Sequence, residues 1–288
     1  MELNALQAFL AVAETGSFSR AASHLHLTQP AVSKRVAGLE HQLDVRLFDR
    51  IGKSTHLTEA GRTLFPKARL ILAEVDESKK LLSNLSGAIA GKLKLGTSHH
   101  IGLHRLPALL RQYHERYPAV ALDIEFTDSE MACDQVLKGD LELAVVTLPS
   151  ETDTQLSMQT IWIDPLICVA NNRHPLVNRD SKITVETLAQ HEALLPSRAT
   201  ATRKIVEGLF SNQNLSPRIG METNYLETLK MMTSIGLGWT ALPEKMIDED
   251  LVRVELDAPA IVRHLGIVTH RERTLSNAAL EFLNLLPG

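Results

Sequence analysis

Three histidines lie close together where a predicted strand, "KLKLGTS", passes into a predicted helix. At the spacing of His99, His100 and His104, two imidazoles can share one helix face and could coordinate a metal ion. No carboxylate or cysteine cluster stands beside them in the sequence, so we expect no metal site and no cofactor. A ligand contact or a structural role stays open for each histidine, and a ligand contact would make affinity depend on pH.

The same turn could hold an anion, because the first N–H groups of a helix have no partner within it. In open α/β sheets, ligands bind at the carboxyl ends of the strands. Serine and threonine hydroxyls supply neutral hydrogen-bond partners there, and an arginine supplies charge. The candidate ligand-binding residues at these predicted positions are Ser98, His99, His100, Thr127, Thr147, Ser197, Arg198, Thr200, Thr202 and Thr240.

No motif for catalysis accompanies these residues. The sequence has no nucleophile elbow, phosphate-binding loop, dinucleotide fingerprint or His-Glu metal motif. Ser197, for example, lacks the flanking glycines of an elbow. We therefore expect a protein that is not an enzyme. The alternative is a cytoplasmic small-molecule-binding protein or enzyme with a helical N-terminal domain.

A second set of polar residues lies in "LTQPAVSKRVAGLE", residues 27–40. Thr28 is a good N-cap, and Pro30 falls near the first helical position, where its missing N–H costs nothing. An apolar stripe runs along this predicted helix at Val32, Val36, Leu39 and Leu43. Off the stripe lie Gln29, Ser33 and Lys34. Together with the short helix predicted just before it, capped by Ser17, the segment has a helix-turn-helix pattern.

Two further elements follow this pattern. Residues 45–58 alternate and turn at Gly52-Lys53-Ser54, which predicts a two-stranded wing. Thr58 then caps a long predicted helix with a heptad rhythm, which indicates a helix–helix seam between two copies of the chain. The alternative is a helix that packs on its own domain. The seam residues are Leu64, Ala68, Ile71, Val75 and Leu82.

The rest of the chain alternates strands and helices, which predicts a parallel, doubly wound α/β region in two lobes. Residues 98–118 are expected to form one helix. We expect a winged helix-turn-helix domain over 1–58 and a linker or dimerisation helix with a hinge over 59–90. A regulatory α/β domain is expected over 91–288. Its first lobe is expected at about 91–161 and 267–288, and its second at about 162–266.

The charge is distributed unevenly along the chain. The net charge is −4, but residues 1–90 hold 11 Lys and Arg against 9 Asp and Glu, whereas residues 91–288 hold 19 against 25. The small positive excess therefore lies in the helical N-terminal region. Only two cysteines occur, Cys133 and Cys168, which excludes a disulfide framework and fits a reducing cytoplasm. We read no signal peptide and no membrane span.

The N-terminal region resembles that of the LysR-type transcriptional regulators. The resemblance is carried by "FLAVAETGSFSRAASHLHLTQPAVSKRVAGLEHQLDVRLFDR" and "LTEAG" over roughly the first 65 residues. Later, "GDLELAVV" and "GLGWTALP" are similar to segments of the family's effector domain, whose fold resembles periplasmic binding proteins. The resemblance implies a bacterial, cytoplasmic regulator, associated with the nucleoid when it is bound to operator DNA. It also implies a small-molecule effector, for which an anion is favoured, and a dimer or a tetramer of dimers.

The resemblance further implies which residues contact double-stranded DNA. The helix that begins after Thr28 would enter the major groove, with side chains of suitable chemistry facing base edges. These residues are Gln29, Pro30, Ser33 and Lys34. Arg35, Arg46 and Arg50 suit phosphates, as do Ser17 and Ser19, and Lys53 on the wing suits the minor groove or the backbone. Thr28 has a structural role as a cap that would suffice by itself.

Overall fold

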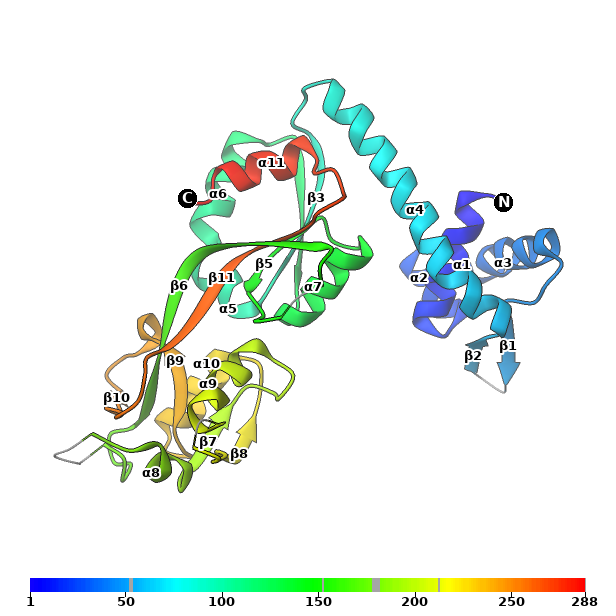
Figure 1. Cartoon of the computed structure of the whole chain (residues 1–288). Helices are drawn as coiled ribbons and strands as arrows, with labels where there is room; N and C mark the ends of the chain where they lie inside the picture. The colour runs from blue at the N-terminus through cyan, green and yellow to red at the C-terminus, as the bar shows by residue number, and fades with distance from the viewer. Residues whose placement is uncertain (52–53, 152, 178–181, 212, 288) are drawn as a thin grey trace. The chain divides into compact units, whose positions relative to one another are not determined.

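The computed structural model describes residues 1–51, 54–151, 153–177, 182–211 and 213–287. The chain divides into two compact units, Met1–Ser86 and Gly87–Gly288 (Figure 1). In the described part, no helix has the length and apolar character needed to cross a membrane.

The first unit is a three-helix core followed by a strand pair and a long helix (Figure 1). Its helices are α1 (Leu3–Thr15), α2 (Phe18–His24), α3 (Gln29–Leu43) and α4 (Glu59–Leu85), and its strands are β1 (Phe48–Ile51) and β2 (Ser54–Leu57). The three predicted caps are confirmed, because the side chains of Ser17, Thr28 and Thr58 accept from the backbone N–H groups three residues on.

The α3 stripe explains how this helix is held. Val32, Val36 and Leu39 are buried in one core with Leu6 and Phe9 of α1. Leu43, the fourth residue of the predicted stripe, is instead 39% exposed. The polar face of α3 therefore remains outside the core of the unit.

Helix α4 divides into two parts that differ in burial. Ala68 is fully buried, and Leu64 and Ile71 pack against the core of their own unit. The first half of the predicted seam therefore packs on its own domain, which was the alternative interpretation of the sequence. Further along, Leu81, Leu82 and Leu85 are 49%, 69% and 84% exposed. Three exposed leucines therefore lie close together on the second half of α4.

The second unit is built on a mixed sheet with strand order β10-β6-β11-β5-β3-β4, in which β9 also pairs with β6. Strands β3 (Gly91–Thr97), β4 (Val120–Phe126) and β5 (Leu143–Thr147) are parallel, as predicted. The wholly parallel sheet is wrong, because β6 (Leu156–Asn171) and β11 (Ile261–His270) pair antiparallel with each other, and β11 inserts antiparallel beside β5. These two long strands run from one lobe into the other (Figure 1).

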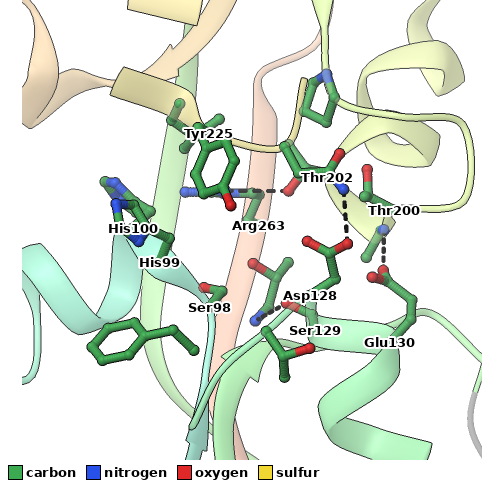
Figure 2. A pocket seen from close by; sticks show the side chains of 17 residues that line it. Ser98, His99, His100, Asp128, Ser129, Glu130, Thr200, Thr202, Tyr225 and Arg263 are labelled. Carbon is green, nitrogen blue, oxygen red and sulfur yellow. Dashed lines mark hydrogen bonds between the residues drawn. The ribbon is translucent and has the colours of Figure 1, made fainter. Parts of the chain in front are cut away.

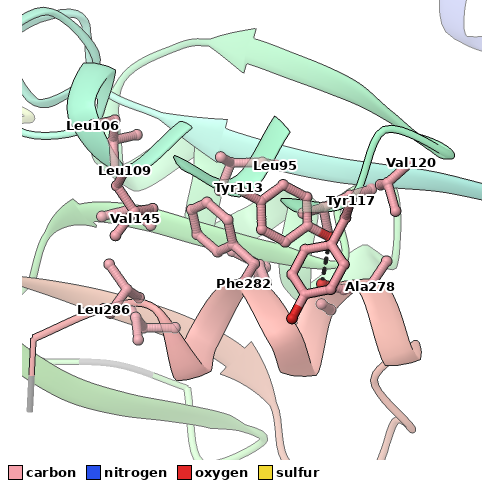
Figure 3. Packing of buried hydrophobic residues seen from close by; sticks show 14 of the residues in the cluster. Leu95, Leu106, Leu109, Tyr113, Tyr117, Val120, Val145, Ala278, Phe282 and Leu286 are labelled. Carbon is pink, nitrogen blue, oxygen red and sulfur yellow. Dashed lines mark hydrogen bonds between the residues drawn. The ribbon is translucent and has the colours of Figure 1, made fainter. Parts of the chain in front are cut away.

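Helices α5 (His99–His104), α6 (Pro107–Arg116), α7 (Ser129–Lys138) and α11 (Asn277–Asn284) belong to the first lobe. The single helix predicted over 98–118 is wrong, because Pro107 cannot continue a preceding helix and instead starts α6. Helix α11 packs back onto the core formed by β3 and α6 (Figure 3). There Tyr113 Oη donates to the Ala278 carbonyl at 2.7 Å, and burial raises the pKa of Tyr113 to about 12.

The second lobe contains a small parallel sheet in addition to the ends of the long strands. That sheet pairs β7 (Glu192–Leu195) with β8 (Arg218–Glu222). The other elements are helices α8 (Val185–Ala189), α9 (Ala201–Ser211), α10 (Leu226–Ser234) and η1 (Glu244–Met246), with strands β9 (Thr240–Pro243) and β10 (Leu251–Arg253). The core includes Phe210 stacked on Trp239, whose ring centroids lie 6.1 Å apart.

Candidate functional site

The exposed face of α3 presents the residues that the sequence singled out. Gln29, Pro30 and Lys34 are exposed, and Ser33 and Arg35 are half-buried. Gln29 Nε2 donates to Ser33 Oγ at 2.9 Å, one helical turn away, so the two side chains orient each other. Together these groups form a hydrogen-bonding surface that carries positive charge on the side of α3 away from the core.

The remaining predicted contacts of this unit are less completely described. Ser17 and Thr28 use a hydroxyl oxygen to cap their helices, which leaves each hydroxyl hydrogen free to donate. Ser19 and Arg46 are exposed. The side chain of Arg50 and all of Lys53 lie outside the described residues.

In the second unit, a pocket of about 400 Å³ lies between the two lobes (Figure 2). It brings together seven of the ten candidates: Ser98, His99, His100, Thr127, Thr147, Thr200 and Thr202. They come from the ends of β3, β4 and β5 and from the start of α9. The carboxyl ends of three parallel strands therefore form the wall of the pocket in the first lobe, which is where ligands bind in open α/β sheets.

Ser197, Arg198 and Thr240 are not among the residues that line the pocket. The Ser197 N–H donates to Asn224 Oδ1 at 2.9 Å, and the Arg198 side chain is exposed. Thr240 is fully buried at the first position of β9, opposite Val169 of β6. Because β9 starts at this residue, Thr240 does not occupy the carboxyl end of a strand.

The floor of the pocket contains a buried ion pair that the sequence did not reveal. Arg263 in β11 donates to Asp164 Oδ2 in β6 from Nε at 3.1 Å and from Nη2 at 2.5 Å, and both side chains are 3% exposed. Arg263 Nη1 also donates to Thr202 Oγ1 at 3.2 Å, and Arg105 donates to Asp164 Oδ1 at 2.7 Å. Only the pairing of the two long strands brings these charges together, and no local pattern could have indicated it.

The environment of this pair shifts the titration of its carboxylate. Burial by itself raises the pKa of Asp164, but the charges and hydrogen bonds of Arg263 and Arg105 outweigh burial and bring the pKa below its ordinary value. Asp164 is therefore held ionised between two guanidinium groups.

The two lobes are also joined at the rim of the pocket (Figure 2). Asn224 Nδ2 of the second lobe donates to Asp128 Oδ2 of the first at 2.8 Å. The Ala201 N–H at the start of α9 donates to Glu130 Oε1 at 2.5 Å. The rings of His99 and Tyr225 meet edge to face, with centroids 5.2 Å apart. Asp128, Glu130, Asn224 and Tyr225 all line the pocket and were missed in the sequence, where nothing distinguishes them from surface polar residues.

The predicted histidines differ in their environment. His99 is half-buried, whereas His100 is buried. Burial, together with the charges of Arg263 and His104, lowers the pKa of His100 to about 4. The His100 imidazole is therefore neutral at neutral pH.

Both cysteines are buried and free. Burial raises the pKa of Cys133 to about 11 and that of Cys168 to about 12. Because the thiolate is the reactive form, both residues have the character of inert core thiols.

Comparison with known proteins agrees with this two-part organisation. The family model "Bacterial regulatory helix-turn-helix protein, lysR family" matches residues 3–62, and the model "LysR substrate binding domain" matches residues 86–287. A probable RuBisCO transcriptional regulator of Cyanidioschyzon merolae is 32% identical over 290 residues, which cover 97% of this chain and 95% of the relative. The transcriptional regulator YeiE of Escherichia coli is 31% identical, with coverage of 98% and 96%.

Solved structures share the fold. A full-length OxyR variant from Pseudomonas aeruginosa superposes with a TM-score of 0.69 at 24% identity, covering 99% of this chain and 93% of that one. Full-length CbnR in complex with its target DNA gives 0.66 at 20% identity, covering 99% of both chains. Two family models together span most of the chain, and full-length relatives exceed 30% identity. The chain therefore belongs to the LysR family of bacterial helix-turn-helix transcriptional regulators, with a DNA-binding and an effector-binding domain.

Proposed function

We propose that α3 reads operator DNA in the major groove through Gln29, Pro30, Ser33 and Lys34. The observation that supports this most is the polar face of α3, where the Gln29–Ser33 hydrogen bond holds an amide and a hydroxyl on the side opposite the buried stripe. Gln suits adenine, and Lys reaches guanine O6 or N7. CbnR, which has the same fold, was solved on its target DNA.

We assign the phosphate contacts to Ser17, Ser19, Arg35, Arg46 and Arg50, with Lys53 on the wing. Such contacts fix the position of the protein on DNA without reading sequence, and they make binding fall steeply with salt.

The test is a gel-shift titration of the full chain on its operator, with a scrambled duplex alongside. Ser33→Ala combined with Lys34→Ala is expected to remove the preference for the operator while leaving salt-dependent binding to both duplexes. Lys94→Ala, an exposed cation in the other unit, is the matched control and should bind as the parent does. Unchanged operator preference in the double variant would contradict the assignment of α3.

We propose that the pocket binds a small effector carrying a carboxylate. Arg263 and the hydroxyls of Ser98 and Thr202 face the pocket. The Ser98 side chain makes no capping bond to α5, so its hydroxyl is not used by the helix. Asp128 and Glu130, which also line the pocket, would accept from hydroxyl or ammonium groups of the same molecule.

Effector binding would shift the lobe contacts at the rim and so change how the chain binds DNA. A thermal-shift screen of small carboxylates on the full chain tests the ligand class, since a ligand selective for the native state raises Tm. Ser98→Ala is expected to reduce the shift for a hit, whereas Ser216→Ala, an exposed serine away from the pocket, should not. Shifts by neutral or cationic compounds alone would contradict the carboxylate.

We further propose that the chain forms a dimer through the exposed second half of α4, and a tetramer from two dimers. Two regulators that this chain resembles over nearly its whole length support a role without catalysis. We place the protein in the cytoplasm, on the nucleoid when it is bound to DNA.

A further inference from the structure

Two histidines of the first lobe face a glutamate of the second lobe beside the pocket. His100 and His104 lie one turn apart on α5, and Glu227 lies in the first turn of α10. His104 Nε2 is 3.0 Å from Glu227 Oε1, and His100 Nδ1 is 3.8 Å from the same oxygen. One ligand atom from each of the three residues lies within 4.8 Å of the others. No metal site was expected, because no carboxylate stands beside the histidines in the sequence. In the folded chain, Glu227 supplies that carboxylate.

Hydrogen bonding within the cluster is incomplete. The His100 side chain is 8% exposed, and its Nδ1 has no hydrogen-bond partner among the described residues. Glu227 Oε2 is also buried and has no hydrogen-bond partner among them. The His104–Glu227 hydrogen bond thus satisfies one carboxylate oxygen and leaves Glu227 Oε2 and His100 Nδ1 buried without a partner among the described residues. Buried polar groups in native proteins are ordinarily paired, so this arrangement calls for an additional partner.

A divalent transition metal fits that space. Zn²⁺ binds imidazole nitrogens and carboxylate oxygens at about 2.0–2.2 Å, so tetrahedral ligands lie about 3.3 Å from one another. The distances from Glu227 Oε1 to His104 Nε2 and His100 Nδ1, 3.0 Å and 3.8 Å, fall on either side of that value. His104 is 45% exposed, so its ring can adjust by a rotamer change.

Nearby charge does not prevent binding. Arg263 is the positively charged residue that acts most strongly on His100, but its charge is paired with that of Asp164. Glu227 adds a negative charge to the cluster itself. Two imidazoles and one carboxylate suit zinc, copper or nickel better than magnesium or calcium, which prefer oxygen ligands.

We propose that His100, His104 and Glu227 form a Zn²⁺-type site that links the two lobes next to the effector pocket. Three protein ligands leave a fourth position open for water or a donor atom from a ligand. Because the ligands come from both lobes, bound metal stabilises the lobe arrangement in which they meet. The site depends on neither the DNA contacts nor the identity of the effector.

The test is calorimetric titration of Zn²⁺ into the full chain after removal of metal with a chelator. One ion per chain is expected, with an affinity at least tenfold weaker in His104→Ala and in Glu227→Gln. His114→Ala removes an exposed histidine elsewhere in the first lobe and is the matched control, which should bind as the parent does. His104 is exposed enough for its variant to fold, and thermal unfolding without metal checks this for both variants.

A second measurement uses Co²⁺ as a spectroscopic probe. The parent and His114→Ala should show the visible bands of tetrahedral cobalt, and zinc should abolish them; His104→Ala and Glu227→Gln should lack them. Equal zinc binding by all four proteins would overturn the site. So would binding of Mg²⁺ in preference to Zn²⁺. A loss of thermal stability in the variants with no zinc binding by the parent would show that the cluster is only an ion pair between lobes.

Discussion

At the scale of single residues, Asp164 and Arg263 connect the site to the framework of the second unit. Each side chain is 3% exposed, and the pair joins the two strands that pass between the lobes beneath the pocket. A buried charge is tolerated only with a partner, and removal of one partner leaves the other uncompensated. The pair therefore combines a structural role with placement of a cation at the pocket floor.

We predict that Asp164→Asn lowers the free energy of unfolding of the second unit by about 3–5 kcal/mol, because Arg263 would remain buried without a counter-charge. Asp123→Asn, which breaks the more exposed Lys92–Asp123 pair, is the control and should cost less than about 1 kcal/mol. Urea denaturation of the full chain, followed by the fluorescence of Trp162 and Trp239, measures both. Similar losses for the two variants would refute the role of burial.

The same carboxylate predicts a pH effect. The pKa of Asp164 is lower in the folded chain than its ordinary value of 3.8. Its contribution is therefore complete above that ordinary value, and it is lost as pH falls through the lower folded pKa. We predict that the parent loses stability more steeply than Asp164→Asn as pH falls below 3.8. Parallel curves of unfolding free energy against pH would contradict this.

At the scale of elements, the start of helix α4 packs closely against the segment that precedes β1. A Cβ added at Gly61 would lie 2.2 Å from the Leu47 carbonyl oxygen, which is backbone and cannot rotate away. Gly61 is buried at the start of α4, where Thr58 caps the helix. The glycine thus permits α4 to begin directly against the segment that precedes β1.

We predict that Gly61→Ala destabilises the first unit by about 1–3 kcal/mol, because the overlap forces the backbone to shift. Gly38→Ala is the control within the same unit: a Cβ there meets nothing within 4 Å, and the residue lies in helix α3. The control should instead stabilise by about 0.5–1 kcal/mol, since alanine favours helix over glycine. Differential scanning calorimetry distinguishes the expected loss of stability in Gly61→Ala from the expected gain in Gly38→Ala. A loss of stability in both variants would contradict the proposed packing at Gly61.

At the scale of the whole molecule, the second half of α4 has apolar side chains that its own unit leaves uncovered. Leu82 and Leu85 are among the most exposed large apolar residues described, at 69% and 84%. Exposed apolar surface of this kind marks an interaction site more often than an isolated surface leucine does.

We predict that Leu82→Asp combined with Leu85→Asp shifts the chain from dimer toward monomer, because two charges would enter an apolar seam. Light scattering after size-exclusion chromatography measures the mass. Leu280→Asp, on α11 and 45% exposed, is the control and should leave the mass unchanged. A dimer that persists in the double variant would place the dimer contact elsewhere.

The sequence by itself determined the structural elements that depend on interactions between residues close in sequence. The caps at Ser17, Thr28 and Thr58 and the stripe of α3 depend on contacts three or four residues apart, so residue type and spacing predicted them. The parallel arrangement of β3, β4 and β5 followed from alternating strands and helices. Five of the seven candidates that line the pocket were found because they lie at the ends of β3, β4 and β5.

Only the tertiary structure decided which distant residues meet. The pairing of β11 with β6 depends on the chain returning from the second lobe, and it places Arg263 opposite Asp164. In the same way, the closing of the two lobes brings Glu227 to His104, 123 positions away in sequence. Such contacts arise from the packing of whole lobes, a cooperative property that leaves no pattern in the neighbouring residues.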